Sequence, residues 1–459
     1  MSEPPAGAVA PPADAPMPKE PQAVKDKKAA KELKRERRAA AKAQQDGAAI
    51  SHAKPEQKPK DAAPRAKNMS EAAPAKSTAA HLVPQASLDK DLSNVGVLGD
   101  ASLFGNVVLP RSAQLNAFSW NAASARATIH PEVLSLCHQL ATFNVRGANK
   151  RAIAVLRALG AVIRDYRTPQ GAVLSRDLLT RVSQQVGHIV ESRPMNTSTG
   201  HAVRFLKYEI SVVDSNLGEA EAKEHLLDRI EHFIRDRIIY AAKVIQTHAA
   251  AKIHDGDVVM AYARSSVIEG TLLQAHRNGV KFEVIVIDSR PLFEGRELAE
   301  RLIGAGIPTT YGLLSSLSTL IPRVNLLLLG TSSLLSNGAP YARAGTAMCA
   351  MLAHGYHIPV IICCETYKFS DRIQLDSFVV NEAGNCSDLL SQEDDSAQSK
   401  SKLLTRAECS AEPRLKVVQL LYDVTPPRYI SAVASEVGLG GTESVGVILR
   451  DYKSVLFGI

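Results

Sequence analysis

Apolar residues recur at three- and four-residue steps from Ile129 to Ile253, which is the spacing of helices that bury one face. The clearest segments are HPEVLSLCHQL, NKRAIAVLRALGAVIRDY, SRDLLTRVSQQVGHIVE and TGHAVRFLKYEIS. A longer stretch, Glu219–Ile253, has an apolar stripe opposite a strongly charged side and predicts one long helix. The pattern therefore predicts an all-helical domain, to which we assign residues 103–253.

The period changes after Gly256. Short runs rich in Val, Ile and Leu follow, namely DVVMAY, FEVIVID, VNLLLLG and IPVIICC, and they are separated by the amphipathic stretches VIEGTLLQAHRNG, FEGRELAERLIGAG and ARAGTAMCAMLAHG. Apolar strands that alternate with helices predict a parallel sheet covered on both faces. We therefore predict an α/β protein in which a Rossmann-like, doubly wound parallel-sheet domain occupies residues 254–459.

This second domain contains one polar, low-complexity segment at residues 387–413, which we interpret as an inserted loop. After it, the stretch LLYDVTPPRYISAVASEVG predicts a strand, a Thr-Pro-Pro turn and a helix that complete the fold. No internal repeat is visible.

The first 102 residues differ from the rest in composition. No Phe, Trp or Tyr precedes Phe104, and 12 of the 24 prolines fall before residue 85. Such a segment cannot bury enough apolar surface to offset its ordering entropy, so it predicts a disordered tail. Between Lys25 and Lys42, nine Lys or Arg against three Asp or Glu supply most of the net charge of +7. This basic run either contacts RNA, the ribosome or an acidic partner, or serves as a solubilising tail.

The six cysteines form no CxxC pair and have no histidines at zinc-ligand spacing, so we expect reduced thiols and no metal site. The N-terminus lacks the apolar segment of a signal peptide. The longest purely aliphatic run, Leu326–Leu329, is far too short to span a bilayer. We expect a cytosolic protein with no membrane contact.

Three loops follow successive predicted strands, on the side where open α/β sheets bind ligands. The first, YARSSVIEGT, offers the hydroxyls of Ser265 and Ser266 and the N–H groups of the following helix to an anion. Alternatively, one of these serines only caps the helix. Serine catalysis needs a base and an orienting acid, and no neighbouring residue supplies them.

The second loop is DSRPLFEGRELAERL. Arg290 and Arg296 bracket a helix start there, while Gly295 permits close approach of the backbone. Two arginines in this arrangement suit a phosphate or a carboxylate. The alternative is a network between these arginines and the neighbouring glutamates at a subunit contact.

The third loop is GTSSLLSNGAPYARAGT. It contains the Asn337-Gly338 turn, Arg343 on the expected following helix, and a helix start at Gly345-Thr346. It is either a ligand or partner loop, or a tight connection in which Gly345 lets a helix pack on the sheet.

These loops, in this order behind a helical domain, resemble one known family. It joins the alpha, beta and delta regulatory subunits of eukaryotic initiation factor two-B to the methylthioribose-phosphate and ribose-bisphosphate isomerases. The resemblance runs from about Leu103 to the C-terminus without residues 387–413, and its most specific segments are RPLFEGRELAERL, GTSSLLSNGAPYARAGT and YDVTPPRYI. IHPEVLSL, SRPMNTSTGHAVRFLK and ESVGVILRDY are most similar to the delta group.

The resemblance implies a regulatory subunit of the guanine-nucleotide exchange factor for initiation factor two. Such subunits assemble with alpha, beta, gamma and epsilon subunits into a decamer, and they sense phosphorylation of the alpha subunit of initiation factor two. The helical domain would contact that substrate, and the Rossmann-like domain would pair with the beta subunit. No cofactor is implied.

Departures from the isomerase pattern bear on catalysis. In the isomerases that this chain resembles, the first loop carries a catalytic cysteine, and Ala263 and Arg264 occupy that place here. The third loop of those isomerases has two acidic residues, and Ser332 and Ala339 occupy their positions here. We therefore expect no catalytic residue, because the proton-transfer groups are missing. The anion-binding elements of the second and third loops remain. The alternative function is a sugar-phosphate or nucleotide-binding allosteric protein, or a residual isomerase.

Overall fold

The computed structural model describes residues 129–214, 216–378, 380–384 and 417–457, together with the short strands β1 (Val97–Leu98) and β2 (Val107–Val108). The chain divides into two units, Met1–Ala80 and His81–Ile459, and every described residue belongs to the second. The predicted disordered tail, apart from β1, and the predicted insertion at 387–413 lie outside the described residues.

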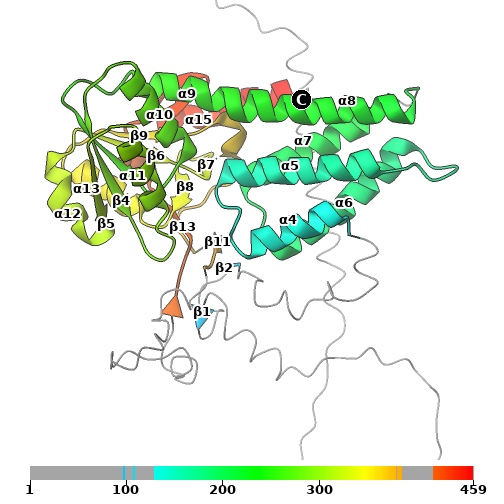
Figure 1. The fold of residues 1–459 in the computed structure, drawn as a ribbon, viewed down its shortest axis with the longest axis horizontal. Helices are drawn as coiled ribbons and strands as arrows, with labels where there is room; N and C mark the ends of the chain where they lie inside the picture. The colour runs from blue at the N-terminus through cyan, green and yellow to red at the C-terminus, as the bar shows by residue number, and fades with distance from the viewer. Residues whose placement is uncertain are drawn as a thin grey trace, which may run out of the picture. The chain divides into compact units, whose positions relative to one another are not determined.

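The predicted helical fold is confirmed between residues 129 and 253, whereas β2 is a strand inside the assigned range 103–253 and the rest of 103–128 lies outside the described residues. The helices are α4 (Pro131–Ala141), α5 (Ala148–Asp165), α6 (Leu174–Ser192) and α7 (Thr197–Val212). The predicted long helix is α8 (Glu219–His232), the π-helical segment η4 (Phe233–Tyr240) and α9 (Ala241–Ala250) in direct succession. In Figure 1 it forms one rod that passes both the helices and the sheet.

Helix α5 lies at the centre of this helical part and packs against α4, α7 and α8. The apolar face predicted from the sequence is buried, with Leu156, Leu159 and Ile163 fully inaccessible to solvent. Leu206 of α7 and Leu226 of α8 belong to the same core. Burial of each such side chain contributes about 1.5–3 kcal/mol, so packing rather than helix propensity holds these helices in place.

The predicted doubly wound sheet is also confirmed. Seven strands lie in the order β15-β14-β9-β6-β3-β4-β5, and all neighbours are parallel except β15. Their bounds are β3 (Val258–Tyr262), β4 (Glu283–Asp288), β5 (Thr309–Leu313), β6 (Leu326–Gly330), β9 (Val360–Cys363), β14 (Ala432–Ser435) and β15 (Gly438–Gly440). The strand order reverses between β3 and β6, which is where such sheets bind ligands.

Both faces of the sheet are covered, because alternate residues of each strand point to opposite sides. Val259 and Ala261 of β3 pack beneath α9, α10 (Ser266–Arg277) and α11 (Glu294–Gly304). Met260 and Tyr262 face α12 (Leu317–Leu320), α13 (Thr346–Gly355) and α15 (Val445–Phe457). Short 3-10 turns are η5 (Leu314–Ser316), η6 (Ile321–Arg323), η7 (Thr366–Lys368), η9 (Pro427–Tyr429) and η10 (Thr442–Ser444).

A second sheet corrects the prediction for the third loop. Its order is β10-β7-β8-β13, with bounds β7 (Ser333–Leu335), β8 (Pro340–Arg343), β10 (Phe369–Ser370) and β13 (Tyr422–Val424). The Asn337-Gly338 turn closes the β7–β8 hairpin. Gly338 has a φ of 78° there, a backbone conformation that glycine adopts more readily than other residues. Arg343 therefore ends a strand and does not belong to the following helix.

The helix predicted within ISAVASEVG is wrong, because this stretch forms β14 and β15. Strand β14 lies between β9 and β15, and Val433 and Ala434 are buried on opposite faces. A short apolar run buried on both sides does not distinguish a strand from a helix by its period. Two further strands, β11 (Asn381–Glu382) and β12 (Val417–Val418), pair with β2 and β1.

Buried polar contacts join the helical part to the α/β part. Arg193, at the end of α6, donates from Nε to Glu382 Oε1 at 2.5 Å. Asn149 of α5 donates from Nδ2 to Glu365 Oε1 at 2.7 Å and accepts from the Tyr367 hydroxyl at 2.5 Å. Among the described helices, none combines the length and the apolar character that a membrane span requires.

Candidate functional site

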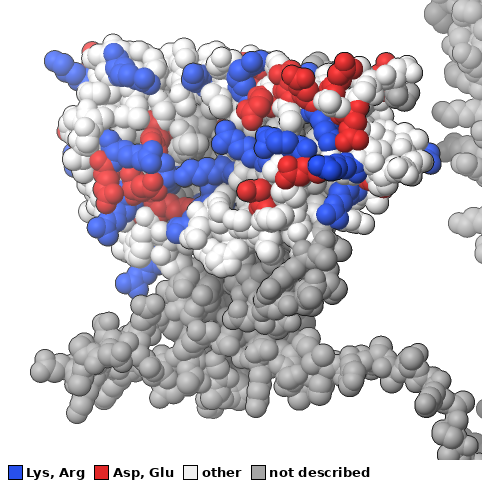
Figure 2. All heavy atoms as spheres, turned by 45° about the vertical axis from the view of Figure 1, so that its right-hand side comes forward, with Lys and Arg blue, Asp and Glu red and all other residues white. Residues whose placement is uncertain are grey.

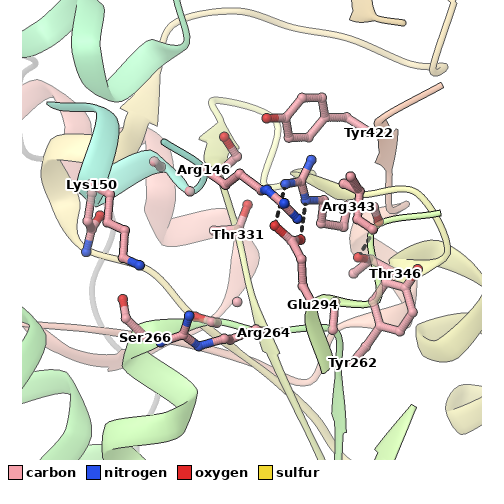
Figure 3. Close-up of a pocket in the computed structure, with 18 of the residues that line it drawn as sticks. Arg146, Lys150, Tyr262, Arg264, Ser266, Glu294, Thr331, Arg343, Thr346 and Tyr422 are labelled. Atoms are coloured by element: carbon pink, nitrogen blue, oxygen red, sulfur yellow. Dashed lines mark hydrogen bonds and ion pairs between the residues drawn. The ribbon is translucent and has the colours of Figure 1, made fainter. Parts of the chain in front are cut away.

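A cavity of about 330 Å³ lies where the start of α5 meets the carboxyl ends of β3 and β6, at the strand reversal of the large sheet. Helix α5 and the turn before it contribute Arg146–Lys150, and the first loop contributes Tyr262–Ser266. Leu329–Ser332 and Arg343 complete the opposite wall. Figure 3 shows Arg146, Lys150, Arg264, Ser266 and Arg343 around one open space.

Four helices begin at this cavity; Asp288 and Asp423 bind N–H groups at the starts of α11 and α13, whereas no described side chain does so at α5 and α10. The cap position of α5 is Gly147, whose φ of 82° suits glycine, and the cap position of α10 is Ser265. Ser265 occupies the capping position that the sequence suggested but makes no capping hydrogen bond. The N–H groups in the first turns of α5 and α10, together with the helix dipoles, therefore favour an anion in the cavity.

Five cations line the cavity, and three of them are held by carboxylates. Arg264 donates to Glu269 at 3.0 Å and to Glu297 at 2.6 Å. Arg343 makes a two-point contact with Glu294, with both distances 2.8 Å, which Figure 3 marks with dashed lines. Lys368 Nζ lies 2.6 Å from Glu365 Oε2. Of the five described cations that line the cavity, Arg146 and Lys150 therefore remain for a ligand.

Neither Arg146 nor Lys150 has an ion-pair partner among the described residues, and both belong to the α5 end of the cavity. Arg146 Nε donates to the Phe143 carbonyl at 2.7 Å, which fixes the side chain but does not neutralise it. The α5 end is therefore the positively charged end of the cavity.

At the start of α13, where the sequence suggested an anion site, a carboxylate of the protein itself binds the N–H groups. The N–H groups of Gly345 and Ala347 donate to Asp423 Oδ2 at 2.8 and 2.9 Å. Thr346 lines the cavity, but its hydroxyl donates to the Arg343 carbonyl at 2.6 Å. The protein's own carboxylate thus fills the position that an anionic ligand would take at this helix.

Arg290, Gly295, Arg296 and Asn337 do not line this cavity. Arg290 is exposed beside a separate small cavity, and Arg296 is exposed and paired with Glu300 at 3.3 Å. A Cβ on Gly295 would lie 2.8 Å from Asp288 Cγ, so this glycine lets α11 approach β4.

Asn337 lies in the β7–β8 turn and donates from Nδ2 to the Gln374 carbonyl at 3.3 Å. Of the nine residues singled out in the sequence, four therefore line the cavity: Ser265, Ser266, Arg343 and Thr346.

Sequence reasoning missed Arg146, Lys150, Lys368 and Tyr422, which also line the cavity. The run VRGANK did carry a signal, because a glycine followed by a helix start and flanked by cations is typical of an anion site. This run lies in the helical part, more than 100 residues before the first loop, so its proximity to the sheet follows only from the fold.

The acidic side chains of the cavity are already paired. The carboxylates that line it are Glu294 and Glu297, and both are bound to arginines. Ala263 and Ser332 line it, whereas Ala339 is buried in the β7–β8 hairpin. No cluster of three or more His, Cys, Asp or Glu side chains within the described ranges is arranged to hold a metal ion. The arrangement suits binding of an anion.

Asp423 gives this region a pH dependence. Burial raises the pKa of its carboxyl from 3.8 to about 6, although the N–H groups of Ala347 and Gly345 oppose the shift. Because the folded state holds the proton more tightly than the unfolded state, this group's contribution to stability is lost as the pH rises from about 4 to about 6.

Asp423→Asn keeps an oxygen that accepts from Gly345 and Ala347 but removes the titration. We expect the free energy of unfolding of the natural protein, relative to this variant, to fall by about 2–3 kcal/mol between pH 4 and pH 7. Urea denaturation across this range measures the difference. Parallel pH curves for the two proteins would contradict the assignment.

The sequence model of the Initiation factor 2 subunit family matches residues 144–441. The eIF2B subunit delta of Schizosaccharomyces pombe (strain 972) is 45% identical over 327 residues, which cover 71% of this chain and 70% of that protein. A ribose 1,5-bisphosphate isomerase of Pyrococcus furiosus is 26% identical over 315 residues, which cover 68% and 91%.

Among solved structures, the tetrameric eIF2B-beta2-delta2 complex from C. thermophilum contains a chain with 36% identity and a TM-score of 0.59. The match covers 67% of this chain and 92% of that one. The family match, residues 144–441, spans most of the helical part and most of the α/β part. It includes the α5 end of the cavity and the three loops. The chain belongs to the Initiation factor 2 subunit family.

Proposed function

We propose that this protein is a non-catalytic, delta-type regulatory subunit of the guanine-nucleotide exchange factor for initiation factor two. The observation that carries the proposal is the 45% identity to a subunit named eIF2B delta over 327 residues. The site is consistent with it, because each carboxylate that lines the cavity among the described residues is bound to an arginine. A residual isomerase is therefore not favoured.

The proposed partners are the alpha, beta, gamma and epsilon subunits of the same exchange factor. The beta2-delta2 complex, in which a similar chain was solved, supports pairing with a beta-type subunit. Ile373 and Leu375, in the segment after β10, are 69% and 85% exposed. Large apolar side chains left this accessible are typical of subunit interfaces. We place part of the beta-type contact on this segment.

The proposed substrate contact is with initiation factor two, especially its phosphorylated alpha subunit, through the helical part. Lys150, Arg157 and Arg164 are exposed at seven-residue steps on α5, so they share one face of the helix. Figure 2 shows a band of basic side chains across the molecule, flanked by acidic groups. Such a surface favours a partner that carries phosphate. A cytosolic location and contact of the basic tail with RNA or the ribosome belong to the same proposal.

Co-expression with a beta-type subunit tests the assembly. The full chain should elute with that subunit in size-exclusion chromatography, and mass spectrometry should find both chains. Ile373→Lys together with Leu375→Lys should weaken the association at least tenfold, because lysines cannot be buried unpaired in an apolar contact. The fold should be retained, since both side chains are exposed.

Val173→Lys is the matched control, because this valine is 58% exposed but lies on the helical part. It should leave the association unchanged. If the natural chain stays a monomer without partners, the assembly itself is refuted. If the natural chain, the double variant and the Val173→Lys control all co-purify equally with the beta-type subunit, only the position of the interface is refuted.

A second candidate function is allosteric binding of a sugar phosphate or a nucleoside monophosphate in the cavity. The observation that favours it is the pair of uncapped helix starts beside Arg146 and Lys150. A phosphate placed there would accept from the N–H groups of α5 and α10, and the unpaired cations would balance its charge.

Calorimetry with ribose 5-phosphate and AMP tests this candidate. The natural chain should bind at millimolar concentration or better, and Lys150→Gln should weaken binding about tenfold through loss of one charged contact. Arg296→Gln is the control, because Arg296 is exposed and lies outside the cavity. No heat at millimolar ligand would remove the candidate without affecting the proposed assembly.

A further inference from the structure

The large sheet has an open edge at β15. This strand pairs with β14 on one side, and no described strand lies on its other side. Leu439 of β15 lies opposite Ala434, whose carbonyl accepts from the N–H of Cys364, directly after β9, at 3.0 Å. Opposite residues of an antiparallel pair either bond to each other or both direct their backbone groups outward, so Leu439 directs its N–H and C=O to the open side. Gly438 and Gly440 flank Leu439, so no side chain of these neighbours blocks an approaching backbone.

The side chain of Leu439 is exposed on the α9 face of the sheet. Residues directly opposite each other in an antiparallel pair project to the same face, and Ala434 belongs to the core that contains Ile245 of α9. Leu439 is nevertheless 41% exposed, and Val437, in the turn between β14 and β15, is 69% exposed. An uncovered edge strand with apolar side chains is a template for pairing with another chain.

Helix α9 extends this apolar surface. His248 of α9 donates from Nδ1 to the Ser435 carbonyl at the end of β14, at 3.2 Å, so this side of α9 faces the β14–β15 hairpin. Val244 and Tyr240 precede His248 by one and two turns, share its side of the helix and are exposed. A group of exposed apolar side chains that border one edge is typical of a protein contact. We call this group the β15 edge patch: Tyr240, Val244, Val437 and Leu439.

The charge beside the β15 edge patch favours an acidic partner. Lys243 Nζ lies 5.4 Å from the centre of the Tyr240 ring, and Lys243 has no ion-pair partner in the part of the chain that the structure describes. Glu436 of the hairpin turn does not balance this charge, because it accepts from the Thr366 N–H at 3.0 Å. Glu443, in η10 after β15, is exposed and would repel a second acid at that end. An acidic side chain of a partner therefore fits beside Lys243.

We propose that the β15 edge patch docks an extended segment of a partner protein that carries apolar and acidic side chains. The segment adds to the sheet as a strand beside β15, and its backbone exchanges hydrogen bonds with Leu439. An apolar side chain of the segment packs against Leu439 and Val244, and an acidic one on the same face lies beside Lys243. The beta-type contact placed on Ile373 and Leu375 uses neither β15 nor α9, so this docking surface goes beyond the proposed function.

Titration calorimetry of the full chain with two capped peptides of about seven residues tests the proposal. One peptide has valine at its centre, a glutamate two positions to either side on the same face, and threonine elsewhere. The other has lysine in place of each glutamate. The glutamate peptide should bind, and the lysine peptide should bind at least about tenfold more weakly because Lys243 repels it. Leu439→Pro removes the outward N–H but no bond to β14, and it should weaken binding of the glutamate peptide at least about tenfold.

Val244→Asp keeps the test decisive if Leu439→Pro fails to fold. An aspartate at this exposed helix position leaves the core intact, removes an apolar contact and repels the glutamates, so binding should again fall at least about tenfold. Ile303→Asp is the matched control, because Ile303 is exposed on α11 and lies outside the β15 edge patch. It should leave binding unchanged.

Three results would overturn the proposal: no binding of the glutamate peptide, equal affinity for the two peptides, or equal binding by the natural chain and both patch variants. Sedimentation of the natural chain and of Leu439→Pro distinguishes the other occupant of this edge. Self-association that Leu439→Pro abolishes, without peptide binding, would also overturn the proposal and assign the edge to a second copy of this chain.

Discussion

Two buried carboxylates, Glu365 and Glu382, connect the helical part of this protein to its α/β part. Glu365 is fully buried and holds Asn149 of α5 at 2.7 Å and Lys368 at 2.6 Å, and both of these partners line the first cavity. Glu382 holds Arg193 at the end of α6. Lys368 and Arg151 also lie beside these two carboxylates, so loss of the Asn149 or the Arg193 contact would remove one hydrogen bond from a buried carboxylate at the junction. These contacts hold the start of α5 and the end of α6 against the α/β part, and the cavity lies where α5 meets the sheet.

The carboxylates of the cavity and of the neighbouring start of α13 are also bound within the protein itself. Glu294 is bound to Arg343, Glu297 to Arg264, and Asp423 to the start of α13. Each carboxylate that could move a proton is instead held by a cation or by backbone N–H groups of the protein itself. The starts of α5 and α10 remain uncapped, and these are the elements that attract an anion without taking part in chemistry.

The sequence was sufficient to predict the helices and most strands, because their apolar periods follow directly from which faces are buried. It failed for β14, where a strand buried on both faces loses its period, and for the β7–β8 hairpin, whose strands have three and four residues. Ser265, Ser266 and Thr346, which line the cavity, were singled out from the sequence because they follow strands of the sheet. Arg146 and Lys150 were not, because they come from the helical part. The hydrogen bonds that join the helical part to the α/β part connect residues 216 and 189 positions apart in the sequence. A pattern of neighbouring residues cannot predict contacts over such separations.

The central claim is that the helical part and the α/β part form one cooperative unit whose junction creates the cavity. Native-state hydrogen exchange of the full chain, measured over increasing denaturant, tests it most directly. The account predicts that the core amides of α5 and α7 and those of β6 and β9 exchange through a single opening with one common free energy. Exchange of α5 and α7 through a smaller opening, while β6 and β9 stay protected, would contradict it.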